Sequence, residues 1–523
     1  MPTVAEKFRA GLRLLLAAAA IACCVCCLPG CASFGSAGNS ASISAVPASA
    51  DAYVPGELVV GVDASRLGAS RAADDIASLG FDVNSVLLHA PNGDASVLLV
   101  RTGEDAQGGS GLAAAAELVG SLPGVSFVQP NYRYATMADS AADAVGDPDA
   151  ARQYYLDSWV DSHGANVAQA WEVLGSGSEV DVAVLDTGMY SMADYLDGSL
   201  VQNDPQNFHQ EFDAGNLDMA DARDFVHSGD GDLLPLVNEY NPTGDDNGHG
   251  THVSGIIAAG STAGGKGAVG MAGVSPFARI IPCKVFDAGG EGDTADIVRA
   301  YEYLMSGEFP NLKVVNLSAS LSFSADEAES EPEDVTPAVE IDPEDAGEEV
   351  EFVDGDQETS DEALHQAIKQ ALDSGIVTVC AAGNESSQEA TYPGDYDECV
   401  CVVALDENGG LASYSNVNEN KDIAAPGSGI YSAWATQADS YAQLDGTSQA
   451  TAIVSGVLAM MFSAKPDLAA NDAKQALYDT AWKSVQVGNG ALDAGAALQL
   501  VKTGSFTKED DPTADDPAGD NPT

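Results

Sequence analysis

The chain has few basic residues. Of its 523 residues, 21 are Lys or Arg and 80 are Asp or Glu, so the formal net charge is −59. A surface of this kind repels a phosphate backbone, so nucleic acid is excluded as an expected partner. The mean hydropathy of −0.04 excludes a polytopic membrane protein, and 45% hydrophobic residues suffice for a sizeable core. We interpret the excess of acidic residues as a means of keeping the protein soluble outside the cell. The alternative is a specific role for some of the carboxylates.

Cysteine is scarce beyond the N-terminus. Five of the nine cysteines lie between residues 23 and 31, and the others are Cys283, Cys380, Cys399 and Cys401. Their spacing does not match a metal site, and apolar surroundings favour buried thiols. On a strand, Cys399 and Cys401 should point to opposite faces and not pair. The sequence has no EF-hand pattern, so no cofactor is expected for chemistry and a structural calcium ion is left open.

The N-terminus is typical of a secretory signal. Three basic residues precede an apolar stretch at residues 14–28: Lys7, Arg9 and Arg13. The tetrapeptide Leu-Pro-Gly-Cys31 that follows resembles the lipobox of bacterial lipoproteins. The resemblance implies lipidation of Cys31, and two acyl chains would hold the protein at the outer face of the bacterial cell membrane. The alternative is ordinary cleavage of a signal peptide within residues 1–31 and release of the protein.

Composition and periodicity divide the rest of the chain. Small-residue segments suggest a tether and a linker or processing region, and the end of the chain reads as an acidic disordered tail. Between the tether and the linker, two β-α-β runs predict a small α+β, ferredoxin-like domain. The segments are residues 32–52 (tether), 53–135 (small domain), 136–150 (linker), 151–503 (large domain) and 504–523 (tail).

Residues 151–503 alternate short apolar strands with helices. Strands are expected at residues 180–185, 313–317 and 376–382, and a helix at 361–372 with a capping box from Thr359 and Glu362. Continuously apolar strands predict an α/β domain with a doubly wound, mostly parallel sheet covered on both faces. An acidic insertion at residues 326–362 contains no Lys or Arg and is expected to be a surface loop.

Three motifs carry chemistry in the order Asp, His, Ser. Asp186 follows an expected strand, at the rim where α/β sheets bind ligands. His249 lies in Asp-Asn-Gly-His-Gly-Thr-His, whose glycines allow close approach of another backbone. Ser448 precedes an apolar helix whose free N–H groups would stabilise an oxyanion. A lone Asp or Ser at such a position is usually a helix cap, so the prediction depends on all three motifs occurring in this order. Without the Glu of a zinc helix, metal binding by the two histidines is disfavoured, and His252 is expected in the core.

A fourth motif, Ala-Ala-Gly-Asn384, closes another expected strand and offers an amide to an oxyanion. Together the four motifs resemble those of the subtilisin-like serine proteases, over roughly residues 153–500. The resemblance implies that Ser448 is the nucleophile, His249 the general base and then acid, and Asp186 the residue that orients the imidazole. Asn384 and the Ser448 backbone N–H would stabilise the tetrahedral oxyanion.

The same resemblance implies a substrate pocket and a propeptide. Small side chains match the walls of the family's primary specificity pocket: Ser318, Ala319, Ser320, Ala381, Ala382 and Gly383. Residues 53–135 resemble the family's propeptide, which templates folding and inhibits the enzyme until cleaved. The implied protein is a secreted serine endopeptidase that acts on proteins or peptides and matures by autoprocessing. The pair Asp147-Pro148 resembles the usual start of the mature enzyme.

Two departures leave other hypotheses open. After the nucleophile, Gln449-Ala-Thr-Ala replaces the family's Met-Ala-Ala/Thr-Pro, and the missing proline could loosen the position of Ser448. Family glycines are replaced by Ala319, Ser320 and Leu321, where substrate backbone would pair. A second hypothesis is therefore a catalytically retired fold that acts as a surface binding module. A third, an acidic calcium-binding envelope protein, is disfavoured because no EF-hand is present.

Overall fold

The computed structural model describes residues 41–137, 153–321 and 360–506, with short internal gaps. The gaps are residues 48, 64–68, 93–94, 104–107, 193, 197–198, 202–206, 229–232, 261–268, 484 and 486. The predicted signal sequence with Cys31, the linker after Met137, the acidic insertion up to residue 359 and the tail after residue 506 lie outside the described residues.

The N-terminal domain, residues 41–137, follows the order β-α-β-β-α-β. Its sheet runs β5-β2-β4-β3, with β2 antiparallel to both of its neighbours. This order is ferredoxin-like. The strand β3 was not expected, because three polar residues at its start, Asp82, Asn84 and Ser85, interrupt its apolar pattern. The elements are β1 (Ser42–Ile43), η1 (Ala50–Ala52), β2 (Tyr53–Val62), α2 (Ala69–Ser78), β3 (Asp82–His89), β4 (Ala95–Arg101), α3 (Gly109–Gly120) and β5 (Val125–Thr136).

The larger domain is built on an eight-stranded sheet in the order β10-β9-β11-β6-β13-β15-β16-β17. All neighbours are parallel except the edge pair β9 and β10, which confirms the mostly parallel sheet. The strands are β6 (Val180–Asp186), β9 (Arg223–Asp224), β10 (Leu234–Pro235), β11 (Ala278–Lys284), β13 (Leu312–Leu317), β15 (Val377–Ala381), β16 (Val400–Leu405) and β17 (Ile423–Pro426).

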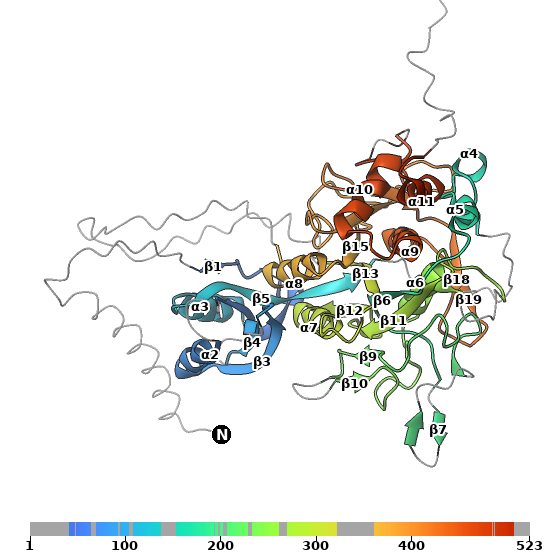
Figure 1. The fold of residues 1–523 in the computed structure, drawn as a ribbon. Helices are drawn as coiled ribbons and strands as arrows, with labels where there is room; N and C mark the ends of the chain where they lie inside the picture. Colours follow the sequence, from blue (N-terminus) through green and yellow to red (C-terminus); the bar gives the residue numbers. More distant parts are fainter. Residues whose placement is uncertain are drawn as a thin grey trace, which may run out of the picture. The chain divides into compact units, whose positions relative to one another are not determined.

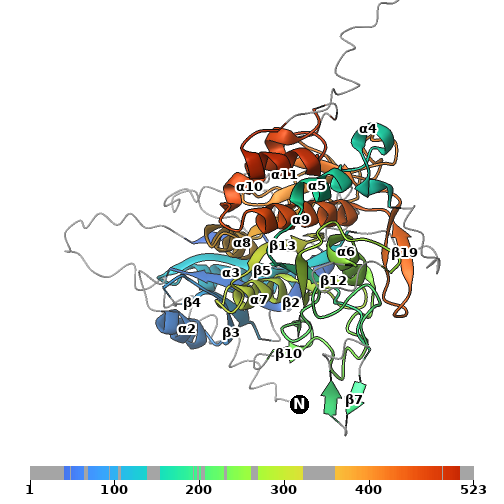
Figure 2. The ribbon, with the colours of Figure 1, turned by 45° about the vertical axis from the view of Figure 1, so that its right-hand side comes forward.

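Helices cover both faces of this sheet. On β6, Val182 and Val184 belong to one hydrophobic cluster and Ala183 and Leu185 to another, as the two-residue period of a strand requires. The first cluster includes α6 (His249–Ala258), α9 (Thr447–Ala464), α10 (Ala470–Thr480) and α11 (Ala494–Thr503); the second includes α7 (Thr294–Leu304) and α8 (Glu362–Asp373). Figures 1 and 2 show these two helical layers on opposite sides of the strands. The doubly wound α/β fold is thus confirmed.

Helix α9 is the central helix of the core. By length and composition alone it could cross a membrane, yet it is 94% buried inside the domain. The smaller elements of the domain are η4 (Tyr154–Leu156), α4 (Trp159–Ser162), α5 (Val167–Leu174), β7 (Asp194–Leu196), β8 (Ser199–Val201), β12 (Glu291–Asp293), β14 (Ala319–Leu321), β18 (Ile430–Ala433) and β19 (Tyr441–Leu444).

Helix α8 confirms the expected apolar face and corrects the expected cap. Leu364 and Ile368 are fully buried, and burial of each such side chain contributes about 1.5–3 kcal/mol. The N-cap is Asp361, whose side chain accepts a hydrogen bond from the Leu364 N–H at 2.9 Å. The capping box was wrong, because Asp361 is the N-cap and the Glu362 N–H, which Thr359 would have capped, donates to Gln129 Oε1; Thr359 lies outside the described residues.

The four cysteines of the larger domain are buried free thiols, as expected. Cys380 and Cys399 share one hydrophobic cluster, with their sulfur atoms 3.5 Å apart. Cys401 belongs to a different cluster. The prediction that Cys399 and Cys401 point to opposite faces is therefore confirmed.

Candidate active site

Asp186 and His249 form a buried pair at the carboxyl end of the sheet. Asp186 is the last residue of β6, and His249 is the first residue of α6. The His249 Nδ1 lies 2.8 Å and 2.9 Å from the two carboxylate oxygens. When Nδ1–H is donated to Asp186, Nε2 is left as the basic atom of the ring. In the described part of the chain, Nε2 is buried and has no hydrogen-bond partner.

The loops that carry this pair are tied together by Thr187 and Asp245. The Thr187 hydroxyl donates to Asp245 Oδ1 at 2.9 Å and accepts from the Gly250 N–H at 2.9 Å. The other oxygen of Asp245 accepts from the N–H and the hydroxyl of Thr251. This buried carboxylate therefore links the end of β6 to the first turn of α6 and holds His249 against Asp186.

Lys284 adds a second link between the same loops. Its side chain is fully buried, and its ammonium donates to the Thr187 carbonyl at 2.9 Å and to Asp246 Oδ1 at 2.6 Å. It also donates to the Phe286 carbonyl. A buried ammonium is tolerated only when paired and hydrogen-bonded, and here the three acceptors meet that need.

Ser448 lies in the first turn of α9 and contacts the end of the N-terminal domain. Its hydroxyl donates to the carbonyl oxygen of Met137 at 2.6 Å and to that of Ser318 at 3.3 Å. The Asn384 Nδ2 donates to the same Met137 oxygen at 2.9 Å. The expected nucleophile and the expected oxyanion donor therefore converge on one carbonyl group.

The orientation of Asn384 is determined by its neighbour. Its Oδ1 accepts from the Thr447 backbone N–H at 3.0 Å and from the Thr447 hydroxyl at 2.9 Å. A backbone N–H can only donate, so the oxygen of the amide must face Thr447. The NH₂ group consequently faces Met137.

The last residues of β5 form an added strand between two short strands of the larger domain. They pair antiparallel with β12 on one side and with β14 on the other. The Thr136 N–H donates to the Gly290 carbonyl at 2.9 Å, and the Met137 N–H to the Ser318 carbonyl at 3.2 Å. In Figures 1 and 2, β5 runs from the N-terminal sheet toward α7, α8 and β12. Ala319, Ser320 and Leu321 pair with this backbone although they replace the family's glycines.

The six expected pocket residues lie on two segments. Ser318 and Ser320 reach Met137, and the Ser320 hydroxyl lies 3.3 Å from the Met137 sulfur. The second segment, Ala381 to Gly383, ends β15 directly before Asn384, and the Gly383 N–H donates to the Thr447 hydroxyl. That this second segment forms a pocket wall stays a prediction, as does the use of the Ser448 backbone N–H as a donor.

His252 is a core residue, as expected. It is fully buried, and its Nε2 lies 3.3 Å from the Ala442 carbonyl oxygen. Burial, with a smaller effect from His249, lowers its pKa to about 3, so the ring stays neutral near pH 7. Within the described ranges, no group of three or more His, Cys, Asp or Glu side chains could hold a metal ion.

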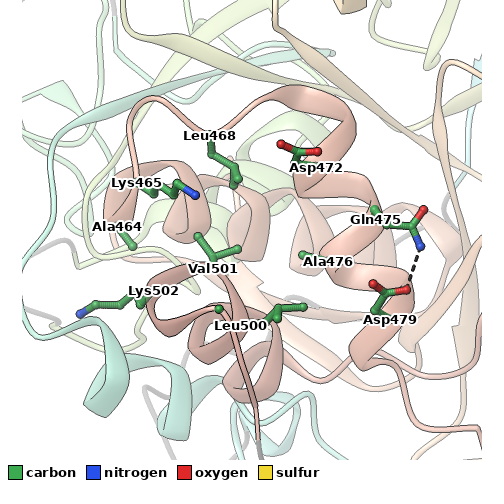
Figure 3. Close-up of a pocket in the computed structure, with 11 residues that line it drawn as sticks. Ala464, Lys465, Leu468, Asp472, Gln475, Ala476, Asp479, Leu500, Val501 and Lys502 are labelled. Atoms are coloured by element: carbon green, nitrogen blue, oxygen red, sulfur yellow. Dashed lines mark hydrogen bonds between the residues drawn. The ribbon is translucent and has the colours of Figure 1, made fainter.

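Asp186, His249 and Ser448 are all buried, and the Met137 carbonyl contacts the Ser448 hydroxyl. Asp186 and Ser448 are 0% exposed and His249 is 3% exposed. A separate hollow of about 520 Å³ lies between the end of α9, α10 and α11 (Figure 3) and is lined by charged residues of both signs, including Lys465, Asp472, Asp479 and Lys502. None of Asp186, His249 and Ser448 lines it, and we assign it no role in the chemistry.

Comparison with known proteins agrees with this geometry. Residues 177–518 match the sequence profile of the subtilase family. The chain belongs to the subtilase family. A thermostable alkaline protease from Halalkalibacterium halodurans is 30% identical over 258 residues, which cover 49% of this chain and 59% of the relative. Thermitase from Thermoactinomyces vulgaris is 28% identical over 335 residues, 63% of this chain and 92% of that relative.

A solved structure shares the fold. Fervidolysin from Fervidobacterium pennivorans, described as a keratinolytic enzyme related to subtilisin, superposes with a TM-score of 0.58 at 20% identity. The match covers 89% of this subtilase and 64% of fervidolysin. This subtilase therefore spans less than two thirds of fervidolysin and of the alkaline protease.

The sequence motifs mark the four polar side chains described above, whose catalytic roles stay predictions, and do not mark Met137. Asp186, His249, Ser448 and Asn384 were each marked by a motif. Met137 lies just beyond β5, at the start of the segment taken as a linker. The only available signal was its place directly after the last strand of the propeptide-like domain.

Proposed function

We propose that this subtilase is a serine endopeptidase that hydrolyses peptide bonds in proteins through an acyl-enzyme. The proposal is supported above all by one observation: Ser448 Oγ and Asn384 Nδ2 both contact a single peptide carbonyl, that of Met137. The buried contact between Asp186 and His249 leaves Nε2 of the ring as the base that this reaction needs. A protein that only binds its partner would not need a serine, an amide donor and an Asp–His pair together.

The reaction follows from these groups. The Ser448 hydroxyl must turn from Met137 toward His249, whose Nε2 takes the proton while Oγ bonds to the substrate carbonyl carbon. The carbonyl oxygen becomes an oxyanion beside Asn384. His249 then gives the proton to the leaving amine as the C–N bond breaks. Water, deprotonated by His249, hydrolyses the acyl-Ser448 ester and restores the enzyme. Asp186 stabilises the imidazolium formed in both halves.

We propose further that the chain matures by cutting its own Met137–Ala138 bond. Support comes from the Met137 carbonyl at Ser448 and from the extended pairing of β5 with β12 and β14, which is the backbone arrangement of a bound substrate. The N-terminal domain would then remain as an inhibitor that occupies the cleft. This site replaces Asp147-Pro148 as our expected start of the mature enzyme.

Intact-mass analysis tests both proposals. The wild-type chain should yield a product that begins at Ala138, whereas Ser448→Ala should stay uncut at this bond. Once the N-terminal domain has been removed, a fluorophosphonate should label the mature protein and not the variant, because only an activated serine reacts. A wild-type chain that is neither cut nor labelled would support the binding-module hypothesis. Equal cutting in both proteins would mean that another protease acts on the linker.

We propose that the protein is secreted and anchored through lipid on Cys31. The support is the succession of three features in residues 7–31: basic residues, an apolar stretch and the tetrapeptide Leu-Pro-Gly-Cys. Acyl labelling in a bacterial host should depend on Cys31, and Cys31→Ala should move the protein from the membrane to the medium. Membrane association that persists in Cys31→Ala would refute the anchor.

A further inference from the structure

Gln449, the residue directly after Ser448, has an amide without a hydrogen-bond partner among the residues that the structure describes. Its side chain is fully buried in the first turn of α9. Within the described part of the chain, neither Nε2 nor Oε1 makes a hydrogen bond. Buried amides are nearly always hydrogen-bonded because an unmade bond is costly. The family commonly has Met at this position, which has no such demand, so the amide calls for a specific explanation.

The position of this amide indicates its partner. The backbone of Gly446 leaves a small space that a Cβ would fill, 2.5 Å from Gln449 Oε1, 2.7 Å from the Met137 carbonyl oxygen and 3.3 Å from Asn384 Nδ2. Gln449, the bound carbonyl and the expected oxyanion donor therefore border the same space. The absence of a side chain at Gly446 keeps that space open.

No hydrogen bond among the described residues determines which end of the Gln449 amide faces this space. Asn384 is oriented by the Thr447 N–H, whereas neither end of the Gln449 amide has a hydrogen-bond partner in those residues. Rotation by half a turn about the last side-chain bond exchanges its oxygen and nitrogen. A developing oxyanion repels Oε1 and attracts the NH₂ group, so charge on the substrate oxygen favours the orientation that donates.

We propose that Gln449 is a further catalytic residue, whose Nε2 donates to the oxyanion alongside Asn384. The inference rests on the proposed protease function and adds a second side-chain donor to it. Because the amide makes no hydrogen bond to the resting Met137 carbonyl, the interaction is gained only as negative charge develops on that oxygen. An interaction made only in the transition state raises kcat and leaves KM nearly unchanged.

The test compares Gln449→Met and Gln449→Glu with wild type on two substrates. One is a peptide with residues on both sides of the scissile bond, and the other is a peptide anilide with none on the leaving side. We expect kcat to fall roughly 10- to 100-fold for both substrates, with KM within about threefold. The exposed Gln475→Met is the matched control and should keep wild-type kinetics.

The pH profile separates donation from a structural role. The Gln449→Glu carboxylate should repel the oxyanion, whereas its protonated form can donate. The ratio of its kcat to that of wild type should therefore rise as pH falls, while the ratio for Gln449→Met stays flat. Melting temperatures of both variants identify any loss of folding, and the pH ratio of Gln449→Glu decides the matter if Gln449→Met is unstable.

Three results would overturn the inference. They are an unchanged kcat in both variants, a change confined to KM, and a loss seen only with the substrate that has residues after the scissile bond. The last result would assign Gln449 to the leaving group. A wild-type chain that is neither cut nor labelled by fluorophosphonate would overturn the proposed function and this inference together, whereas a labelled wild type with unaffected variants overturns this inference alone.

Discussion

At the scale of single residues, Asn384 shows how one side chain serves two purposes. Its oxygen accepts from Thr447 at the start of α9, and its NH₂ group donates to the bound carbonyl of Met137. Asn384→Asp keeps the acceptor and loses the donor. We expect this variant to fold and to lose about 10²- to 10³-fold in kcat, the size known when such a donor is removed from subtilisin.

Steady-state kinetics and the melting temperature of Asn384→Asp check this expectation, with the exposed Asn420→Ala as the control. A variant that keeps wild-type kcat would show that the contact with Met137 matters only in the resting state. A large fall in melting temperature would instead assign Asn384 to the support of α9.

The residues of the site differ in how far the sequence reveals them. Asp186, His249, Ser448 and Asn384 lie in local motifs whose glycines and flanking strands are visible in a few consecutive letters. The contact of Met137 with Ser448 joins residues 311 positions apart and depends on the pairing of β5 with β12 and β14. No local pattern records such a pairing, because both partners have to fold first.

At the scale of elements, β5 caps two helices of the larger domain. Gln129 Oε1 accepts from the Glu362 N–H at the start of α8, and Asn131 Oδ1 accepts from the Ala295 N–H at the start of α7. Two residues apart on a strand, these amides share one face. Both helices already carry an Asp at the N-cap, Asp293 and Asp361. Neutral amides on β5 therefore satisfy further N–H groups of both helices without placing more carboxylates beside them.

The same contacts explain why some elements were foreseen and others were not. The apolar spacing of Leu364 and Ile368 marks the buried face of α8 in the sequence, and the structure follows it. The cap depends on a tertiary contact, since Gln129 and Tyr134 of β5 both donate to the Asp361 carboxylate. The polar residues at the start of β3 obscured this strand in the sequence pattern, and its pairing with β4 holds it in place.

Asp361 should make stability depend on pH. Desolvation raises the pKa of its carboxyl above the ordinary 3.8, opposed by hydrogen bonds from Leu364, Thr294, Gln129 and Tyr134. A raised pKa in the folded state means that stability from this group is fully present below 3.8 and is lost as pH rises through the raised value. Asp361→Asn removes this titration. As pH rises from 3.8 through the raised pKa, the free energy of unfolding of Asp361→Asn should therefore fall less than that of the parent protein.

Urea unfolding of the uncut Ser448→Ala chain across pH, with and without Asp361→Asn, measures the difference. Asp293 and Asp296 face the same region, and burial also raises their pKa, so the parent profile will contain their contributions as well. The exposed Asp373→Asn, at the other end of α8, is the control and should leave the profile unchanged. Parallel profiles for the parent and Asp361→Asn would refute the assignment.

At the scale of the whole molecule, the net charge of −59 is spread unevenly. The described chain stops at Leu321, in the strand β14 that pairs with β5, and resumes at Ser360, next to the Asp361 that binds β5. The described residues on either side of the gap that holds the acidic insertion therefore adjoin β5. Carboxylates attached there should raise the negative potential around the entry of a substrate.

The last prediction follows from this placement. Deletion of residues 326–359, which joins Ala325 to Ser360, should leave a folded enzyme that a fluorophosphonate still labels, because Asp361 and α8 are retained. A field from exposed charges changes the rate of encounter more than the chemistry, and salt screens it beyond about 8 Å at physiological ionic strength. Values of kcat/KM for matched cationic and neutral peptides should therefore show a weaker preference for the cationic series after deletion, most clearly at low salt. The two enzymes should converge as salt is added, since screening removes the same interaction from the parent. An identical charge preference with and without the insertion, at every salt concentration, would mean that its carboxylates serve solubility alone.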